Sequence, residues 1–190
     1  AMTCGWISGD FNLMMADAPG RIRFPVPAYL IDHPKGRVLF DSGLHPDIQT
    51  DMRGRAGDVM ADLFEVEFRP GEEIEARLAA LDIAADSIDY IVNSHLHWDH
   101  TGGNTLVANA KIIIQKKEWE AGQVPELIEQ NLFNPADYNH GHQIQQIDGE
   151  HDLFGDGTVV TVPTYGHTPG HQSLKVKLAS GDIILAADAC

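Results

Sequence analysis

Short apolar runs separated by glycine-containing turns dominate the chain, and this pattern is typical of β-strands. Pro25 and Pro27 lie within the first expected strand and favour an edge position or a bulge, because proline cannot donate a hydrogen bond to a neighbouring strand. A turn at residues 34–36 predicts a hairpin between the first two strands. The expected strands span residues 21–32, 37–43, 88–93, 111–115, 143–147, 158–162, 172–178 and 182–187.

Helical periodicity is weaker and is confined to a few segments. Ile74, Leu78 and Leu81 recur at spacings of four and three residues, which predicts a helix over residues 72–82. The mixture of strands and helices predicts an α/β layered fold. We also expect short helices over residues 118–121 and 125–133, loop with short helix over 45–70, and irregular structure over the first twenty residues.

The composition is that of a globular protein with a packed core. Of the 190 residues, 43% are hydrophobic and 22% are charged, which suits one domain over residues 1–190. The 28 acidic residues outnumber the 13 basic ones, so the net charge of −15 disfavours nucleic acid and anionic membranes as partners. The apolar runs are far shorter than the ~20 residues of a membrane span, and we expect no signal peptide, because the first residues lack the basic and apolar pattern of one. Cys4 and Cys190 make no disulfide framework, and we expect a cytoplasmic protein.

Histidine is unusually frequent: five of the ten histidines fall in two short clusters. The first cluster, residues 94–104 (SHLHWDHTGGN), directly follows a buried strand. His95 and His97 are two residues apart, so in extended backbone their rings leave the same side. Asp99 and His100 follow where the chain turns, and their side chains point elsewhere. The cluster therefore offers two imidazoles to one cation and a carboxylate with an imidazole to a second, which suits zinc, iron, manganese or cobalt.

The second cluster occupies residues 163–173 (PTYGHTPGHQS), between two expected strands. Its Pro-Gly turn is expected to aim His171 back toward a site. His167 is either a further ligand or a group that holds the loop by hydrogen bonds. Asp188 follows an apolar strand, where a carboxylate either caps the strand or bridges two cations through its oxygens. Beside the two histidine clusters, the ligand interpretation is favoured for Asp188.

The order and spacing of these groups resemble the metallo-β-lactamase superfamily over nearly the whole chain. The residues that carry the resemblance are the motif His95-x-His97-x-Asp99-His100, then His171 on a loop and Asp188 at a strand end. Asp41, after an apolar strand, is similar to the superfamily's buried aspartate near the site. Within the superfamily, residues 24–30, 94–104 and 166–174 look most like the quorum-quenching N-acyl-homoserine lactonases.

The resemblance implies a four-layer αβ/βα sandwich with a dinuclear site at its rim, usually holding two zinc ions. The implied ligands are His95, His97 and His171 for the first metal, Asp99 and His100 for the second, and Asp188 as the bridge, with Asp41 and His167 supporting them from outside. The superfamily's last ligand histidine and the lactonases' tyrosine have no counterpart in the chain. We therefore expect a C-terminal part of the fold to be supplied by further polypeptide, and a homodimer is a further expectation.

The activity implied by the resemblance is hydrolysis of a small lactone or ester. A hydroxide bridging the metals would attack the carbonyl and Asp99 would move a proton, opening the ring of an N-acyl-homoserine lactone. Met14, Phe64 and Phe68 are candidate walls for the acyl chain, although core packing is an equal interpretation of them. The alternatives are a glyoxalase II-like thioesterase or other metallohydrolase of this fold, a mononuclear-iron persulfide dioxygenase, and a non-enzymatic binding module.

Overall fold

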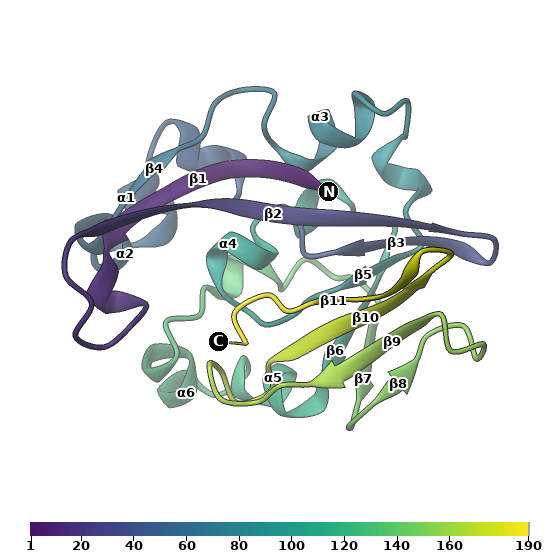
Figure 1. The fold of residues 1–190 in the computed structure, drawn as a ribbon. Coiled ribbons are helices and arrows are strands. Elements are labelled where there is room, and N and C mark those ends of the chain that lie inside the picture. The colour runs from purple at the N-terminus through teal and green to yellow at the C-terminus, as the bar shows by residue number, and fades with distance from the viewer. Residues whose placement is uncertain (190) are drawn as a thin grey trace.

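The computed structural model describes residues 1–189 and contains two β-sheets packed face to face, with helices against the larger one (Figure 1). Cys190 lies outside the described residues. The strands of the larger sheet are β1 (Met2–Asp10), β2 (Arg21–His33), β3 (Gly36–Phe40), β4 (Phe64–Glu67), β5 (Tyr90–Val92), β6 (Lys111–Gln115) and β7 (Ile144–Ile147). They lie in the order β4-β1-β2-β3-β5-β6-β7, with antiparallel pairing on the β4 side and parallel pairing from β3 to β7.

The smaller sheet is antiparallel and has the order β11-β10-β9-β8. Its strands are β8 (His151–Asp152), β9 (Val159–Pro163), β10 (Gln172–Leu178) and β11 (Gly181–Leu185). The α-helices are α1 (Met52–Ala56), α2 (Asp58–Leu63), α3 (Ile74–Ala79), α4 (Trp98–Thr101), α5 (Lys116–Ala121) and α6 (Pro125–Gln130). Short 3-10 turns are η1 (Phe11–Leu13), η2 (Pro46–Gln49), η3 (Ala85–Ser87), η4 (Asn104–Leu106) and η5 (Pro135–Asp137). Among the described residues, no helix has the length and apolar character needed to cross a membrane.

The central parallel strands are buried on both faces, which is why they read as continuous apolar runs. Successive side chains of a strand point to opposite faces. Ile112 of β6 therefore packs with the helices in one core, while its neighbour Ile113 packs against the smaller sheet in the other. Val159 and Leu174 of the smaller sheet close that second core. Helices, large sheet and small sheet thus form consecutive layers, and the expected α/β sandwich is confirmed.

The outer face of the smaller sheet is open to solvent at its β11 edge. Ile184 pairs with Lys175 of β10, and its side chain is 64% exposed. Leu174 on the opposite face of β10 is fully buried. Every described helix precedes β7 in the chain. The buried hydrophobic residues of these helices belong to the core on the larger sheet.

The N-terminal segment differs from its prediction. It was expected to be irregular but forms β1, an inner strand paired with both β2 and β4. The register between β1 and β2 shifts between Thr3 and Trp6, opposite Pro27 and Pro25. The prolines therefore mark an irregular ladder and not a sheet edge, and the shift breaks the period-two pattern of β1. Strands β4 and β8 were also not predicted: β4 lies in the segment 45–70 expected to be loop and short helix, and the two residues of β8 are too few to show a period.

The fold brings one end of each sheet to the same place. Phe40 at the end of β3 pairs with Val92 at the end of β5, so Asp41 and the loop after β5 start side by side. The loop between β9 and β10 is joined to them by Gln172. Its backbone N–H donates to the Ser94 carbonyl at 2.9 Å, and its side-chain Nε2 donates to the Asn93 carbonyl at 2.8 Å. Both histidine clusters are thereby held at one rim.

Candidate metal centre

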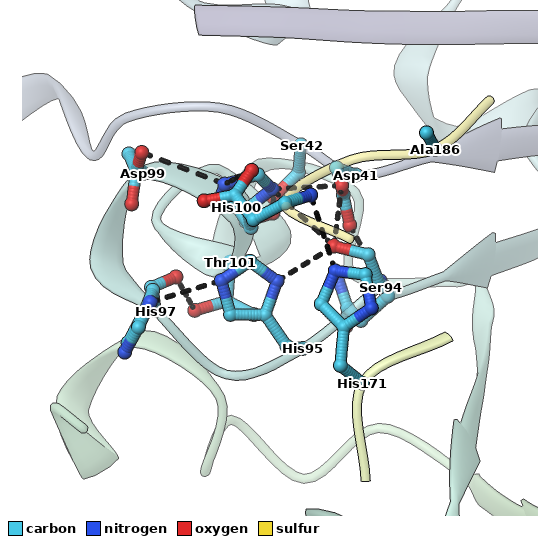
Figure 2. A network of polar contacts seen from close by, with 12 residues as sticks. Asp41, Ser42, Ser94, His95, His97, Asp99, His100, Thr101, His171 and Ala186 are labelled. Atoms are coloured by element: carbon cyan, nitrogen blue, oxygen red, sulfur yellow. Dashed lines mark hydrogen bonds and ion pairs between the residues drawn. The ribbon is translucent and has the colours of Figure 1, made fainter. Parts of the chain in front are cut away.

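The first histidine cluster bends out of the sheet directly after β5. His95 is fully buried, and His97 stands just before α4 as its N-cap residue. The Nε2 atom of His95 lies 2.9 Å from the Nδ1 atom of His97 (Figure 2). The opposite ring nitrogens have partners of their own: Ser94 Oγ at 2.9 Å from His95 Nδ1, and the Asn131 carbonyl at 2.9 Å from His97 Nε2. These partners orient the two rings and leave the two nitrogens that face each other, His95 Nε2 and His97 Nδ1, available to a cation.

Asp41 holds the next histidine in place. Its buried carboxylate accepts hydrogen bonds from the Ser94 backbone N–H at 2.7 Å and the Ser94 hydroxyl at 2.8 Å. The Nδ1 atom of His100 is 2.8 Å from the same carboxylate, so the Nε2 atom of His100 turns toward the rim. Asp41 has a φ of 57°, a conformation that aspartate and asparagine adopt more readily than most residues. The structure thus places Asp41 beside the cluster, as the sequence predicted.

Two carboxylates face the free nitrogen of His100. Asp188 Oδ1 lies 3.4 Å from His100 Nε2, and Asp99 Oδ2 lies 3.5 Å from it. Asp99, Asp188 and Asp41 together outweigh burial and raise the pKa of His100 well above its ordinary value. In return, His100 lowers the pKa of Asp188 against the opposing effect of burial. This half of the centre is therefore anionic and suited to a cation.

The second loop contributes two histidines in different ways. His171 is buried, and its ring centroid is 5.0 Å from that of His95. Its Nδ1 meets the Thr164 hydroxyl at 2.8 Å, and its Nε2 accepts the backbone N–H of Asp188 at 3.1 Å. His167 instead reaches the facing nitrogens of the first cluster, with its Nε2 3.1 Å from His97 Nδ1. His167 also lies 3.4 Å from Asp188 Oδ2, so it sits inside the cluster and not behind it.

The predicted ligands converge, but they group differently from the sequence assignment. The structure gathers ligand atoms within 4.8 Å of one another in two groups, His95 with His97 and His167, and His95 with His100 and Asp188. His171 and Asp99 stand beside these groups without joining them. The difference arises at His171, because the Asp188 backbone N–H occupies the nitrogen that would face a cation.

The donor set fits divalent metal ions. His95 Nε2 and His97 Nδ1, 2.9 Å apart, leave room for at most one hydrogen between them, so at least one of the two nitrogens is unprotonated and offers its lone pair. Burial keeps these imidazoles neutral: it lowers the pKa of His97 to about 4 and the pKa of His171 to about 4. Burial and the neighbouring imidazoles also lower the pKa of His95 well below its ordinary value. Neutral imidazoles beside carboxylates are the ligands that zinc, iron, manganese and cobalt take in proteins.

A cavity of about 360 Å³ opens beside the centre. Trp98, between His97 and Asp99 in the chain, lines it together with Met60, Leu132 and Phe133. The Phe133 ring centroid lies 5.7 Å from that of His97, so the apolar wall reaches the metal centre. These walls were not predicted from the sequence. Only Trp98 carried a signal, as an aromatic residue inside the histidine motif.

The predicted acyl-chain walls lie elsewhere. Phe68 is 7% exposed and belongs to the large core, and Phe64 is half-buried against the same core. Met14 follows η1 and is exposed. None of the three lines the cavity beside Trp98. The core-packing interpretation therefore holds for both phenylalanines, because β4 and the segment after it pack against β1.

Comparison with known proteins places this geometry in a family. Residues 21–189 match the family model described as the metallo-beta-lactamase superfamily. The chain is 39% identical over 185 residues to the N-acyl homoserine lactonase AttM of Azorhizobium caulinodans, covering 94% of this chain and 70% of that protein. It is 35% identical over 185 residues, with the same coverage, to AttM of Rhizobium radiobacter.

A solved structure agrees. It shows an N-acyl homoserine lactone hydrolase with the product N-hexanoyl-L-homoserine bound at its catalytic metal center. It superposes with a TM-score of 0.84 at 26% identity, over 96% of this chain and 72% of that one. The fold and the two His/Asp groups together indicate a dinuclear metal site. This chain belongs to the metallo-beta-lactamase superfamily.

Proposed function

We propose that the protein is a metal-dependent hydrolase that opens the lactone ring of N-acyl-homoserine lactones. The observation that carries the proposal is the convergence of imidazoles and carboxylates at one rim, in a chain 39% identical to an N-acyl homoserine lactonase. We further propose two zinc ions as the native metals, with iron, manganese or cobalt as alternatives. A cytoplasmic location and a homodimer stay predictions.

We propose the ligand assignment that the resemblance implies. His95, His97 and His171 would hold one ion, Asp99 and His100 the other, and Asp188 both. The observed geometry supports the pairing of His95 with His97, and of His100 with Asp188. For His171 to ligate, its Nε2 must leave the Asp188 backbone N–H. His167 is the competing ligand, because its Nε2 already faces His97.

The chemistry divides between the metals and the side chains. When bound, the two cations supply a water that is acidic near neutral pH and a Lewis acid for the carbonyl oxygen. The Asp99 carboxylate lies at the rim, 3.5 Å from His100 Nε2, and in this proposal it would accept the water's proton and return it to the departing ring oxygen. Water adds across the ester bond, and the product is an N-acyl-homoserine.

The cavity beside Trp98 would take the acyl chain. Its volume of about 360 Å³ and its apolar walls, including Leu132 and Phe133, suit a chain of several methylenes. Each buried CH₂ contributes ~0.8 kcal/mol to binding. Trp98 follows His97 directly, so a chain lying against the indole keeps the lactone carbonyl beside the metal centre.

The test is a substrate panel with metal-loaded protein. Lactones with acyl chains of increasing length, thioesters and a persulfide are assayed in parallel, with metal content measured on the same sample. Lactone turnover with two metals per chain is the expected result. Thioester turnover without lactone turnover would favour the glyoxalase II-like alternative, and persulfide oxidation with one iron per chain would favour the dioxygenase.

A further inference from the structure

Glu118 is a fully buried carboxylate beside the metal centre, on the helix α5 that follows β6. Its Oε1 atom accepts the backbone N–H of Leu96 at 2.9 Å. Its Oε2 atom accepts the backbone N–H of Gly170 at 2.7 Å. One side chain therefore joins two loops that are distant in the sequence, and Figure 1 shows α5 next to the chain that enters β10.

The two amides stand next to the candidate ligands. Leu96 lies between His95 and His97, and Gly170 immediately precedes His171. A carboxylate that holds both amides sets the separation of the two loops, and thus the separation of the imidazoles that they present. The sequence offered one weak signal for this role, a charged residue shortly after an apolar strand.

The contact is close and leaves no room for adjustment. A Cβ atom added at Gly170 would lie 2.7 Å from the Glu118 Cβ and closer still to the Glu118 backbone nitrogen. The loop thus packs directly on α5, with glycine required by proximity. Real Cβ atoms do not approach other atoms this closely, so any larger residue at Gly170 must move the loop.

Burial of the Glu118 carboxylate carries a free-energy cost. Burying a charge without a cation costs free energy that only hydrogen bonds recover. Among residues 1–189, no Lys, Arg or His stabilises the Glu118 carboxylate by its charge. The cost of burying it is offset by hydrogen bonds, including those from the two amides. Each oxygen of Glu118 accepts one of these two N–H groups, and a glutamine in the same place would turn an NH₂ group toward one of them.

We propose that Glu118 is a positioning residue of the metal centre, which fixes the distance between the loop of His95 and His97 and the loop of His171. This rests on the proposed assignment of those histidines as metal ligands. Glu118 itself contacts neither substrate nor metal in this account. Its effect is on the affinity and geometry of metal binding, which are measurable without any substrate.

The principal variant is Glu118→Gln, which keeps the shape but turns an NH₂ group toward one of the two amides. Zn²⁺ affinity is measured by competition with a chromophoric chelator, and ligand geometry by the visible absorption of the Co²⁺-loaded protein. We expect 10–100-fold weaker Zn²⁺ binding and an altered Co²⁺ spectrum, which is the usual effect of losing a group that orients ligands.

The matched control is Tyr138→Phe. Tyr138 is also fully buried, and its hydroxyl donates to the Gly122 carbonyl just after α5 at 2.9 Å. The change removes one buried hydrogen bond near the same helix but neither of the hydrogen bonds that join Glu118 to the two loops. Its Zn²⁺ affinity and Co²⁺ spectrum should match those of the unmodified protein, whatever its loss of stability. A second variant, Gly170→Ala, displaces one loop while leaving the carboxylate in place, and should also weaken Zn²⁺ binding.

Each outcome decides the proposal. Unchanged Zn²⁺ affinity and Co²⁺ spectrum in folded Glu118→Gln would overturn it. Failure of both variants to fold would also overturn it, because the carboxylate would then serve the fold and not the metal centre. Absence of Zn²⁺ binding by the unmodified protein would remove its basis. If the unmodified protein binds Zn²⁺ but opens no lactone, the proposed substrate is wrong while the test of Glu118 stands.

Discussion

Asp41→Asn tests how the orientation of one proposed ligand, His100, affects metal binding. Asparagine has nearly the same shape as aspartate and tolerates the φ of 57° at this position, so the backbone need not move. Its single oxygen can keep the Ser94 backbone N–H, now 2.7 Å from Oδ1. The NH₂ group then replaces the oxygen that lies 2.8 Å from His100 Nδ1.

That exchange reverses the hydrogen bond to His100. With a donor beside Nδ1, the imidazole must carry its proton on Nε2, the nitrogen that faces Asp99 and Asp188. A proton there blocks a metal. Loss of a group that hydrogen-bonds to a metal ligand typically lowers metal affinity 10–100-fold, which corresponds to ~1.4–2.8 kcal/mol. Loss of a hydrogen bond to a charged group costs ~1.5–3 kcal/mol. The two magnitudes agree.

The assay is a Zn²⁺ competition titration of both proteins at pH 7.5. Asp152→Asn is the control, because Asp152 also accepts several backbone N–H groups, including those of Gly155 and Gly157, but lies in β8 opposite the start of β9, away from the two histidine clusters. We expect weaker binding only in Asp41→Asn. Equal Zn²⁺ affinity in the folded Asp41→Asn protein would refute the tautomer argument.

Three further predictions concern other groups. Asp99→Asn should lower lactone turnover by ~100-fold or more at full metal occupancy, with little change in urea stability, since it removes a proton carrier and keeps the shape; undiminished turnover would contradict the role of Asp99. Burial raises the pKa of the Cys4 thiol to about 12, so iodoacetamide should label Cys4 no faster than the protein unfolds, as followed by peptide mass spectrometry; rapid native labelling would be inconsistent with this burial. In metal-free protein, burial lowers the pKa of His97 and His171 to about 4, below the ~6.5 of an unfolded chain. The unfolded chain then binds more protons at these two groups between these values, so their contribution to stability should fall as the pH drops from about 6.5 to about 4; an NMR titration that finds both rings protonating near 6.5 in the folded protein would disprove it.

Local patterns carried much of the fold. Strand β6 (Lys111–Gln115) was predicted with its observed bounds from its apolar run, and β10 (Gln172–Leu178) likewise from the alternation of apolar and polar residues in its second half. The helix predicted over residues 72–82 forms only over Ile74–Ala79. The convergence of the first histidine cluster could also be predicted, because the spacing of residues along one loop largely decides which of their side chains can meet.

Tertiary structure decided what depends on long-range contact. Strand β1 exists because β2 and β4 supply its hydrogen bonds, and the register shift opposite the prolines hid its period. Glu118 gains its place only when Leu96 and Gly170, remote in the chain, converge on α5. His167 enters the centre, and the cavity forms beside Trp98, for the same reason. The physical cause is that sequence periodicity reports neighbours along the chain, whereas burial and ligand geometry are set by neighbours across it.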